Sequence, residues 1–350
     1  MKNHISLFIF AIALLSGPVS ANDLSMTAVK DTLASIPGEH NYIYVRTPLG
    51  EDEEKNYDEI TFYDGLGREL DFAQSYGADR AGAIMAHHHL IEYDSLGRKE
   101  KQWLSTNTSF SYMSPEDLKG GVLWDYHDAG KRSYLQTNYE SSPLNRITEQ
   151  YGVGDAWGDH PARMEYLTNI PADSLRCSFY FIDDNDSLIR RGDYRSGELQ
   201  VTKATDEDGK PTYTFVDKQG RTLLTRLGRG NQQADTYFVF DRFGRIRYVL
   251  PPMINDEISA GNLDLYAYQY LYDSFGRCIS KKLPGCAAIG YVYDKADRVI
   301  LSQNGNQSQK KEWTFTFYDN QGRLALTGLC SFNDPPSLDN SIVRAYRTTS

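Results

Sequence analysis

The sequence contains little cysteine, no excess of positive charge, and no hydrophobic run long enough to cross a membrane. Its 350 residues include 4 Cys, too few for a scaffold built by disulfides. Lys and Arg number 37 against 47 Asp and Glu, for a net charge of −10. Such a chain repels phosphate backbones and anionic lipid headgroups, which argues against nucleic-acid and membrane-surface partners. No apolar stretch approaches the ~20 residues of a membrane span.

Aromatic residues and glycine are abundant. The chain has 25 Tyr, 15 Phe and 28 Gly but 6 Met, a composition that suits pleated sheets and tight turns better than helices. Its length allows one large domain or two to three ordinary ones. We therefore expect a mostly β protein.

The N-terminus has the pattern of a secretory signal peptide. A positive charge at Lys2 precedes an apolar stretch from Ile5 to Leu15, and small residues follow at Val19 and Ala21. We predict cleavage between Ala21 and Asn22 and export to the periplasm, the outer cell surface or the medium. Loss of Lys2 would lower the net charge to −11. Residues 22–39 are expected to form a lead with a short helix that ends before Pro37.

One short phrase, Asp-x-x-Gly-Arg, recurs along the chain. A short apolar or aromatic run precedes each copy, and the residue before Asp is aromatic in most copies. DKADR at 294–298 lacks the glycine, and DEDGK at 206–210 has Lys in place of Arg. The intact copies are Asp64, Gly67, Arg68; Asp94, Gly97, Arg98; Asp217, Gly220, Arg221; Asp241, Gly244, Arg245; Asp273, Gly276, Arg277; and Asp319, Gly322, Arg323.

The chemistry of these residue types predicts a β-hairpin corner. Asp accepts hydrogen bonds from the backbone two residues on, Gly adopts the left-handed conformation that closes a short turn, and Arg begins the return strand. An exposed Asp–Arg pair across the corner contributes less than about 1 kcal/mol. Because the spacing between copies is irregular, we predict consecutive hairpins in a curved, twisted, all-β sheet. Because the phrase is repeated many times, we interpret its copies as architecture and not as catalytic groups.

These repeats resemble the YD repeats of the bacterial RHS (rearrangement hot spot) and teneurin-like family. The stretch Tyr139 to Trp157 resembles the region before the repeats in exported RHS proteins. On this basis residues 40–170 are expected to form an N-terminal RHS-associated module and 171–350 a repeat segment. The resemblance implies a ribbon that spirals into a shell around a C-terminal toxin or other cargo. The sequence shows no C-terminal core signature and no toxin domain, so we expect a front end of such a protein.

The function that follows is a non-catalytic exported scaffold, without a cofactor, whose partner is a protein cargo or a downstream RHS segment. A second hypothesis is a surface protein that binds cell-surface glycan through aromatics clustered in a groove. A third is a hydrolase with carboxylates among its loops, since glycosidase carboxylates leave no short motif. No nucleophile elbow, phosphate loop or zinc-protease motif is present.

Three weaker patterns have ordinary alternatives, and a fourth is a variant of the corner. His87 and His89 could share a metal ion, but a solvated strand start is favoured. Asp183, Asn185 and Ser187 alternate as in a calcium loop, but Leu188 replaces the required glycine, so a hairpin turn is favoured. A disulfide between Cys278 and Cys286 is one candidate, with free thiols as the favoured alternative. Asp128 to Lys131 reads as a degenerate corner between two strands.

Overall fold

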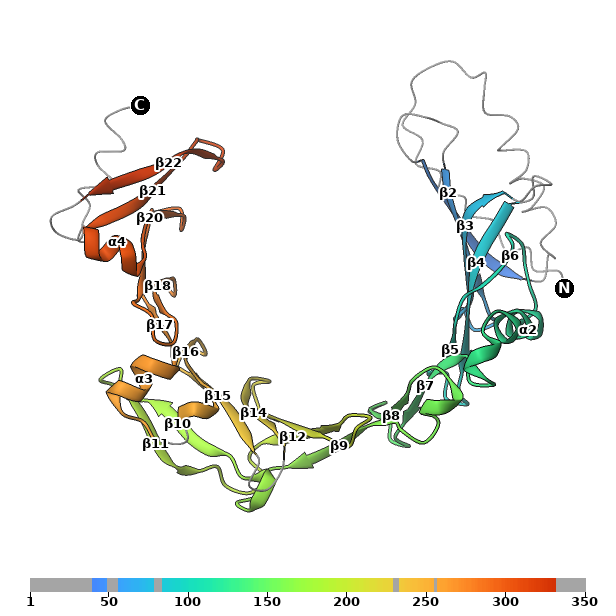
Figure 1. The fold of residues 1–350 in the computed structure, drawn as a ribbon, viewed down its shortest axis with the longest axis horizontal. Helices are drawn as coiled ribbons and strands as arrows, with labels where there is room; N and C mark the ends of the chain where they lie inside the picture. Colours follow the sequence, from blue (N-terminus) through green and yellow to red (C-terminus); the bar gives the residue numbers. More distant parts are fainter. Residues whose placement is uncertain (1–39, 49–55, 79–83, 229–232, 255–256, 332–350) are drawn as a thin grey trace. The chain divides into compact units, whose positions relative to one another are not determined.

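A computed structural model describes residues 40–48, 56–78, 84–228, 233–254 and 257–331 of the chain (Figure 1). The predicted signal peptide with its Ala21/Asn22 cleavage site, and the predicted helix within 22–39, lie outside the described residues. The chain divides into two compact units. The first comprises residues up to Met164 together with Asp206–Gly209, and the second comprises Glu165–Thr205 and the residues from Lys210 onward.

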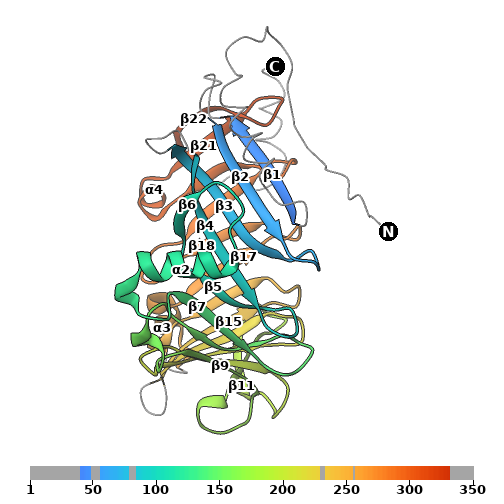
Figure 2. The ribbon, with the colours of Figure 1, turned by 90° about the vertical axis from the view of Figure 1, so that its right-hand side faces the viewer.

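The first unit is an antiparallel sheet in which most sequence neighbours are paired, while β6 pairs with β4 and β7 pairs with β5. Figure 2 shows β1, β2 and β3 as adjacent arrows, in agreement with their pairing. β4 pairs with β3 on one edge, and on its other edge with β6 in its first half and β5 in its second. The strands are β1 (Asn41–Pro48), β2 (Asn56–Tyr63), β3 (Glu69–Ala78), β4 (Ile84–Tyr93), β5 (Lys99–Trp103), β6 (Thr106–Ser109), β7 (Tyr134–Tyr139), β8 (Ile147–Tyr151) and the start of β9 (Ala162–Thr168).

Within the described part of this unit, helix α2 (Pro115–Asp125) interrupts the sheet and is followed by the 3-10 turns η1 (His127–Ala129) and η2 (Asp155–Trp157). Ser114 caps the helix by accepting a hydrogen bond from the backbone of Asp117, and Pro115 occupies its first turn. Leu118 and Val122 form the buried side of the helix. The predicted strand before Asp128 is therefore wrong: the residues up to Asp125 are helical, and Asp128 lies in η1.

The second unit contains a longer antiparallel meander, β12 to β22, and a separate two-stranded sheet of β10 and β11. Its strands are β10 (Ser178–Ile182), β11 (Leu188–Asp193), β12 (Gln200–Thr205), β13 (Pro211–Val216), β14 (Thr222–Leu227), β15 (Ala234–Phe240), β16 (Ile246–Leu250), β17 (Tyr268–Tyr272), β18 (Cys278–Lys282), β19 (Ile289–Tyr293), β20 (Val299–Gln303), β21 (Glu312–Tyr318) and β22 (Leu324–Ser331). Short helices connect some of them: η3 (Asp173–Leu175), η4 (Pro252–Ile254), α3 (Ala260–Tyr266) and α4 (Gly305–Lys310).

Hydrophobic packing is uneven within this second unit. A buried cluster that includes Tyr180, Phe215, Leu224 and Val239 lies between the β10–β11 hairpin and the strands β12 to β16. Within β17 to β22, by contrast, Leu301 and Trp313 are the buried hydrophobic residues. That part of the ribbon has little core of its own, so other contacts must order it.

The meander explains why the phrase recurs at alternate turns. In an antiparallel ribbon, successive connections alternate between the two ends of the strands, so every second connection lies at the same end. In the second unit, the corners that begin at Asp217, Asp241, Asp273, Asp294 and Asp319 join β13–β14, β15–β16, β17–β18, β19–β20 and β21–β22. We call the side of the ribbon formed by these strand ends the corner edge. The connections on the opposite, variable edge differ in length, and two of them carry α3 and α4.

The predicted all-β fold class is confirmed: the described part of the chain is nearly all antiparallel β, arranged in consecutive hairpins. Among the described residues, no helix has the length and apolar character that a membrane span needs. The longest, α2, has 11 residues.

Candidate functional site

The most regular feature of the molecule is its set of corners, which repeat one hydrogen-bond pattern. At Asp241, Oδ1 accepts from the backbone N–H of Phe243 and of Arg245, each at 2.9 Å. Oδ2 accepts from Nε of Arg245 at 2.7 Å. Main-chain bonds close the turn, from Asp241 N–H to the Arg245 carbonyl and from Gly244 N–H to the Asp241 carbonyl. The same contacts occur at Asp64, Asp94, Asp217, Asp273, Asp294 and Asp319.

Glycine is required at these corners by backbone conformation. The six glycines of the intact copies have φ between 77° and 83°, in the left-handed region. In the copy that lacks glycine, Asp297 takes this position with φ of 59°. Asp is one of the few side chains that tolerate this region, so the corner at 294–298 keeps its shape.

Hydrogen bonding keeps the corner carboxylates ionised. The backbone N–H of Arg68 lowers the pKa of Asp64, and its guanidinium adds to this effect. Burial raises the pKa of Asp241, but the hydrogen bonds from Arg245 more than offset it, and the net pKa is lowered. These acidic groups are thus held as anions by their own Arg, which makes them poor candidates for proton transfer at neutral pH.

Three further turns belong to the same type. At Glu140 the corner is longer: its backbone N–H donates to the Arg146 carbonyl, and Arg146 donates to both carboxylate oxygens at 2.7 and 2.8 Å. The sequence search missed this corner because two extra residues separate its acid and Arg. At Asp183, Oδ1 accepts from the backbone of Asn185 and Ser187, so the proposed calcium-loop residues form a hairpin turn. At Asp206, the N–H of Gly209 donates to its carbonyl.

A β-bulge accompanies the corners. The strand register shifts immediately before the last strand residue, as between Phe62 and Tyr63, Val239 and Phe240, or Leu271 and Tyr272. A bulge bends a strand and increases its right-handed twist. Because the shift recurs at the same place, each hairpin adds a similar increment of twist to the ribbon.

The corner arginine also contacts the next corner along the chain. Its guanidinium carbon lies over the ring of the aromatic residue that precedes the next acid, a contact we call the clasp. The ring-to-guanidinium distances are 4.5 Å for Arg68–Tyr93, 4.7 Å for Arg98–Tyr139, 5.0 Å for Arg221–Phe240, 4.8 Å for Arg245–Tyr272, 5.0 Å for Arg277–Tyr293 and 4.8 Å for Arg298–Tyr318. Each clasp therefore joins two successive hairpins.

Two hydrogen bonds reinforce the clasp. The tyrosine hydroxyl donates back to the carbonyl of the residue after the arginine, as in Tyr272 to Ile246 at 2.9 Å and Tyr293 to Cys278 at 2.8 Å. Nη1 of Arg277 donates forward to the carbonyl of Asp294 at 3.1 Å. A half-exposed cation–π contact contributes about 0.5–1 kcal/mol and a hydrogen bond about 1 kcal/mol. The clasp thus exceeds what the Asp–Arg pair contributes by itself, and it orders strands that have little core.

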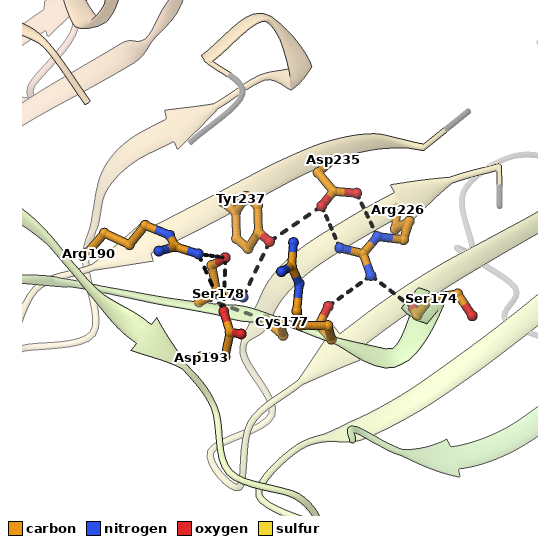
Figure 3. A network of polar contacts seen from close by, with 9 residues as sticks. Ser174, Cys177, Ser178, Arg190, Asp193, Arg226, Asp235 and Tyr237 are labelled. Atoms are coloured by element: carbon orange, nitrogen blue, oxygen red, sulfur yellow. Dashed lines mark hydrogen bonds and ion pairs between the residues drawn. The ribbon is translucent and has the colours of Figure 1, made fainter. Parts of the chain in front are cut away.

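A separate polar network attaches the β10–β11 hairpin to the sheet (Figure 3). Arg226 is 2% exposed and donates to both carboxylate oxygens of Asp235 and to the carbonyls of Ser174 and Arg176. The Tyr237 hydroxyl accepts from the backbone N–H of Ser178 at 3.3 Å. The Arg226 guanidinium is thus satisfied by groups of the protein itself, so this network is a structural anchor.

The structure corrects the solvated-strand interpretation of the histidines. His88 is 1% exposed, and its ring nitrogens lie 2.7 Å from Oδ2 of Asp71 and 3.0 Å from the carbonyl of Ser109. It ties β4 to β3 and β6. His87 and His89 flank it on β4, and no group of three His, Cys, Asp or Glu suited to a metal ion occurs in the described part of the chain.

The cysteines are free thiols within the described residues, so Cys278 and Cys286 are not joined. Cys177 is buried, and burial raises the pKa of its thiol to about 12. A thiol in this state is a weak nucleophile at neutral pH.

Comparison with known proteins gives a family match over part of the chain. The family described as "Domain of unknown function (DUF6443)" matches residues 41–168. This range covers a little over a third of the chain and lies inside the segment 40–170 that the sequence set apart. No curated protein matches the chain.

Solved structures give a match in fold. TcdB2-TccC3 is similar with a TM-score of 0.54 and 13% identity, over 84% of this chain and 14% of that chain. TcdB2-TccC3-Cdc42 gives 0.55 and 14% identity over 84% and 14%, and TcdB2-TccC3-TEV gives 0.53 and 13% over 89% and 15%. The chain thus spans about one seventh of these structures. At this identity the likeness is one of fold alone.

Proposed function

We propose that the protein is an exported, non-catalytic scaffold of RHS type that forms part of a shell around a protein cargo. The observation that carries this proposal is the succession of clasps along the chain, which we call the clasp ladder. Each clasp couples one hairpin to the next, so the most regular charged and aromatic residues of the chain serve to extend a ribbon. Repeat units that contact only their neighbours are typical of extended architecture.

The last described strand supports an assembly role. Among the described residues, β22 pairs with β21 alone, and its side chains Leu324, Leu326 and Leu329 are exposed. An apolar strand with an open edge is normally covered or paired, because it otherwise promotes aggregation. A further hairpin of the same type, in a downstream RHS segment, is the partner that would continue both the hydrogen bonds and the clasp ladder.

Protease protection tests the scaffold proposal. The protein, tagged after residue 22, would be purified from the cells that naturally make it and treated with proteinase K. We expect a co-purifying polypeptide that resists digestion until urea unfolds the sheet. In the variant Arg245→Ala/Arg277→Ala, which lacks two clasps, the same polypeptide should be digested early. Immediate digestion of every co-purifying polypeptide from the unaltered protein, or purification of the chain alone, would contradict an enclosing scaffold.

Export is tested separately from enclosure. Residues 1–40 fused to alkaline phosphatase, which is active only after leaving the cytoplasm, should give phosphatase activity, and the released protein should begin at Asn22. A fusion that lacks residues 1–21 is the control and should be inactive. Equal activity of the two fusions, or an uncleaved N-terminus, would show that the segment is not a signal peptide.

A further inference from the structure

A hollow of about 630 Å³ lies in the second unit, where the end of β11, the loop that follows it and the corner at Asp217 meet. We call it the cationic hollow. Phe179 and Tyr194 form its aromatic wall, with ring centroids 4.8 Å apart in an edge-to-face arrangement. The hollow is independent of the clasp ladder except at Arg221, whose guanidinium binds Asp217 and covers Phe240.

Three exposed cations converge on this hollow. Arg191 comes from β11, Arg195 from the loop after it and Lys218 from the corner. None of the three side chains forms an ion pair with another described residue. The chain as a whole carries a net charge of −10, whereas the hollow is lined by four cations and three carboxylates. A local excess of unpaired cations on an acidic protein attracts a ligand with a negative charge.

Two of the three carboxylates, Asp193 and Glu198, can accept further hydrogen bonds, whereas Asp217 is held by its own corner. Asp193 faces Arg190 and Ser178 through Oδ1, at 3.5 and 3.4 Å (Figure 3), and its Oδ2 accepts nothing from the described residues. Glu198 accepts the backbone N–H of Arg195 through Oε2 at 2.9 Å. Ionised carboxylates act only as acceptors, so an occupant of this hollow must also bring donors.

We propose that the cationic hollow binds an acidic sugar of a glycan chain. The carboxylate of a uronic or sialic acid would meet Arg191, Arg195 and Lys218, its hydroxyls would donate to Asp193 and Glu198, and Phe179 and Tyr194 would contact its apolar face. An acidic peptide side chain supplies the charge but few donors for Asp193 and Glu198. A neutral sugar leaves the three cations unused. The proposal does not depend on the scaffold function.

Calorimetric titration of the purified chain tests the proposal with trigalacturonate and sialyllactose, which represent the two sources of the acidic sugar. At least one of them should bind, more weakly as NaCl is added because screening acts on exposed charges. Maltotriose, a neutral trisaccharide, should not bind. The double variant Arg191→Glu/Arg195→Glu should weaken binding about tenfold or more.

Lys218 offers a matched control. Lys218 and Lys295 both follow the Asp of a corner and are both exposed, but Lys295 lies outside the hollow. Lys218→Glu should weaken binding several-fold, and Lys295→Glu should not, while unchanged thermal unfolding shows that both variants fold. No binding of either acidic sugar would overturn the proposal. Equal loss in both Lys variants, or equal binding of hexaglutamate, would do so as well, the latter indicating an acidic peptide site.

Discussion

At the scale of single residues, the corner depends on its glycine, because a residue without a Cβ adopts the left-handed conformation without strain. Gly220 has φ of 79° and no heavy atom near the place where a Cβ would lie, so only backbone strain opposes a side chain there. Gly220→Ala should therefore lower the free energy of unfolding by about 1–2 kcal/mol.

Gly261 provides the matched control for this substitution. It also has open space around it, but it lies in α3 with no positive φ. Gly261→Ala should raise the free energy of unfolding by up to about 1 kcal/mol, because alanine favours the helix. Urea unfolding of both variants makes the comparison. Equal effects would mean that the corner does not require the left-handed conformation.

Glu140 should make stability depend on acid pH. Hydrogen bonds from the Arg146 side chain, and then from Ser142, lower the pKa of Glu140 from 4.5 to about 2. A carboxyl whose pKa is lowered by folding stabilises the native state above its unfolded pKa, and this contribution is lost as the pH falls through the folded value. Glu140→Gln should thus be less stable than the unaltered protein at pH 7, with the difference shrinking from pH 4.5 towards pH 2.

Thermal unfolding across this pH range measures the difference. Glu207→Gln is the control, because Glu207 is exposed in a turn and forms no ion pair with a described residue. A gap between Glu140→Gln and the unaltered protein that stays constant from pH 7 to pH 2 would contradict the assigned role of this carboxylate.

The sequence predicts part of the corner chemistry. The roles of Asp and Gly follow from local conformational rules, and the structure places the six phrases at hairpin turns. The contact of Arg277 with Tyr293 does not follow, because it depends on which strands are neighbours and on the bulge that aims the ring. The burial of His88 was equally hidden, since Asp71 and Ser109 come from other strands.

At the scale of elements, two clasps of the chain differ by one hydroxyl group and can be compared directly. Tyr272 stacks under Arg245 and donates to Ile246, whereas Phe240 stacks under Arg221 without a hydroxyl. Tyr272→Phe should lower the free energy of unfolding by about 1 kcal/mol, and Phe240→Tyr should raise it by a similar or smaller amount. Urea unfolding measures both. If neither variant changes stability, the hydroxyl hydrogen bond contributes nothing and stacking alone makes the clasp.

Helix α2 shows where reading elements from sequence failed and why. The sequence predicts two strands around a degenerate corner at Asp128 to Lys131. The second is present as β7, but the residues before the corner belong to helix α2. Its start nevertheless carries a helix signal, with Ser114 as cap, Pro115 in the first turn and acidic residues after it. Packing of Leu118 and Val122 outweighs the low helix propensity of Gly120 and Gly121.

At the scale of the whole molecule, stability should vary along the second unit. Strands β12 to β16 cover a hydrophobic cluster, whereas β17 to β22 rely mainly on corners and clasps. Hydrogen exchange followed by mass spectrometry should therefore be slower in β12 to β16. Regions with few buried contacts open with lower free energy.

Arg277→Lys tests how far one clasp acts. Lysine keeps the charge opposite Asp273 but loses the planar contact with Tyr293 and the hydrogen bond to Asp294. Exchange should accelerate in β19 to β22 and stay unchanged in β12 to β16. The control is Arg323→Lys, because Arg323 pairs with Asp319 but covers no ring among the described residues. Acceleration confined to the turn at Asp273 in Arg277→Lys would show that the hairpins are not coupled.

The difference between the corner edge and the variable edge limits how such a chain can change in length. Gain or loss of a single strand would reverse the direction of every strand after it and move later corners to the wrong edge. Gain or loss of two strands preserves this parity. Lineages of this chain should accordingly differ by whole hairpins, while insertions of other sizes accumulate in connections such as those that carry α3 and α4.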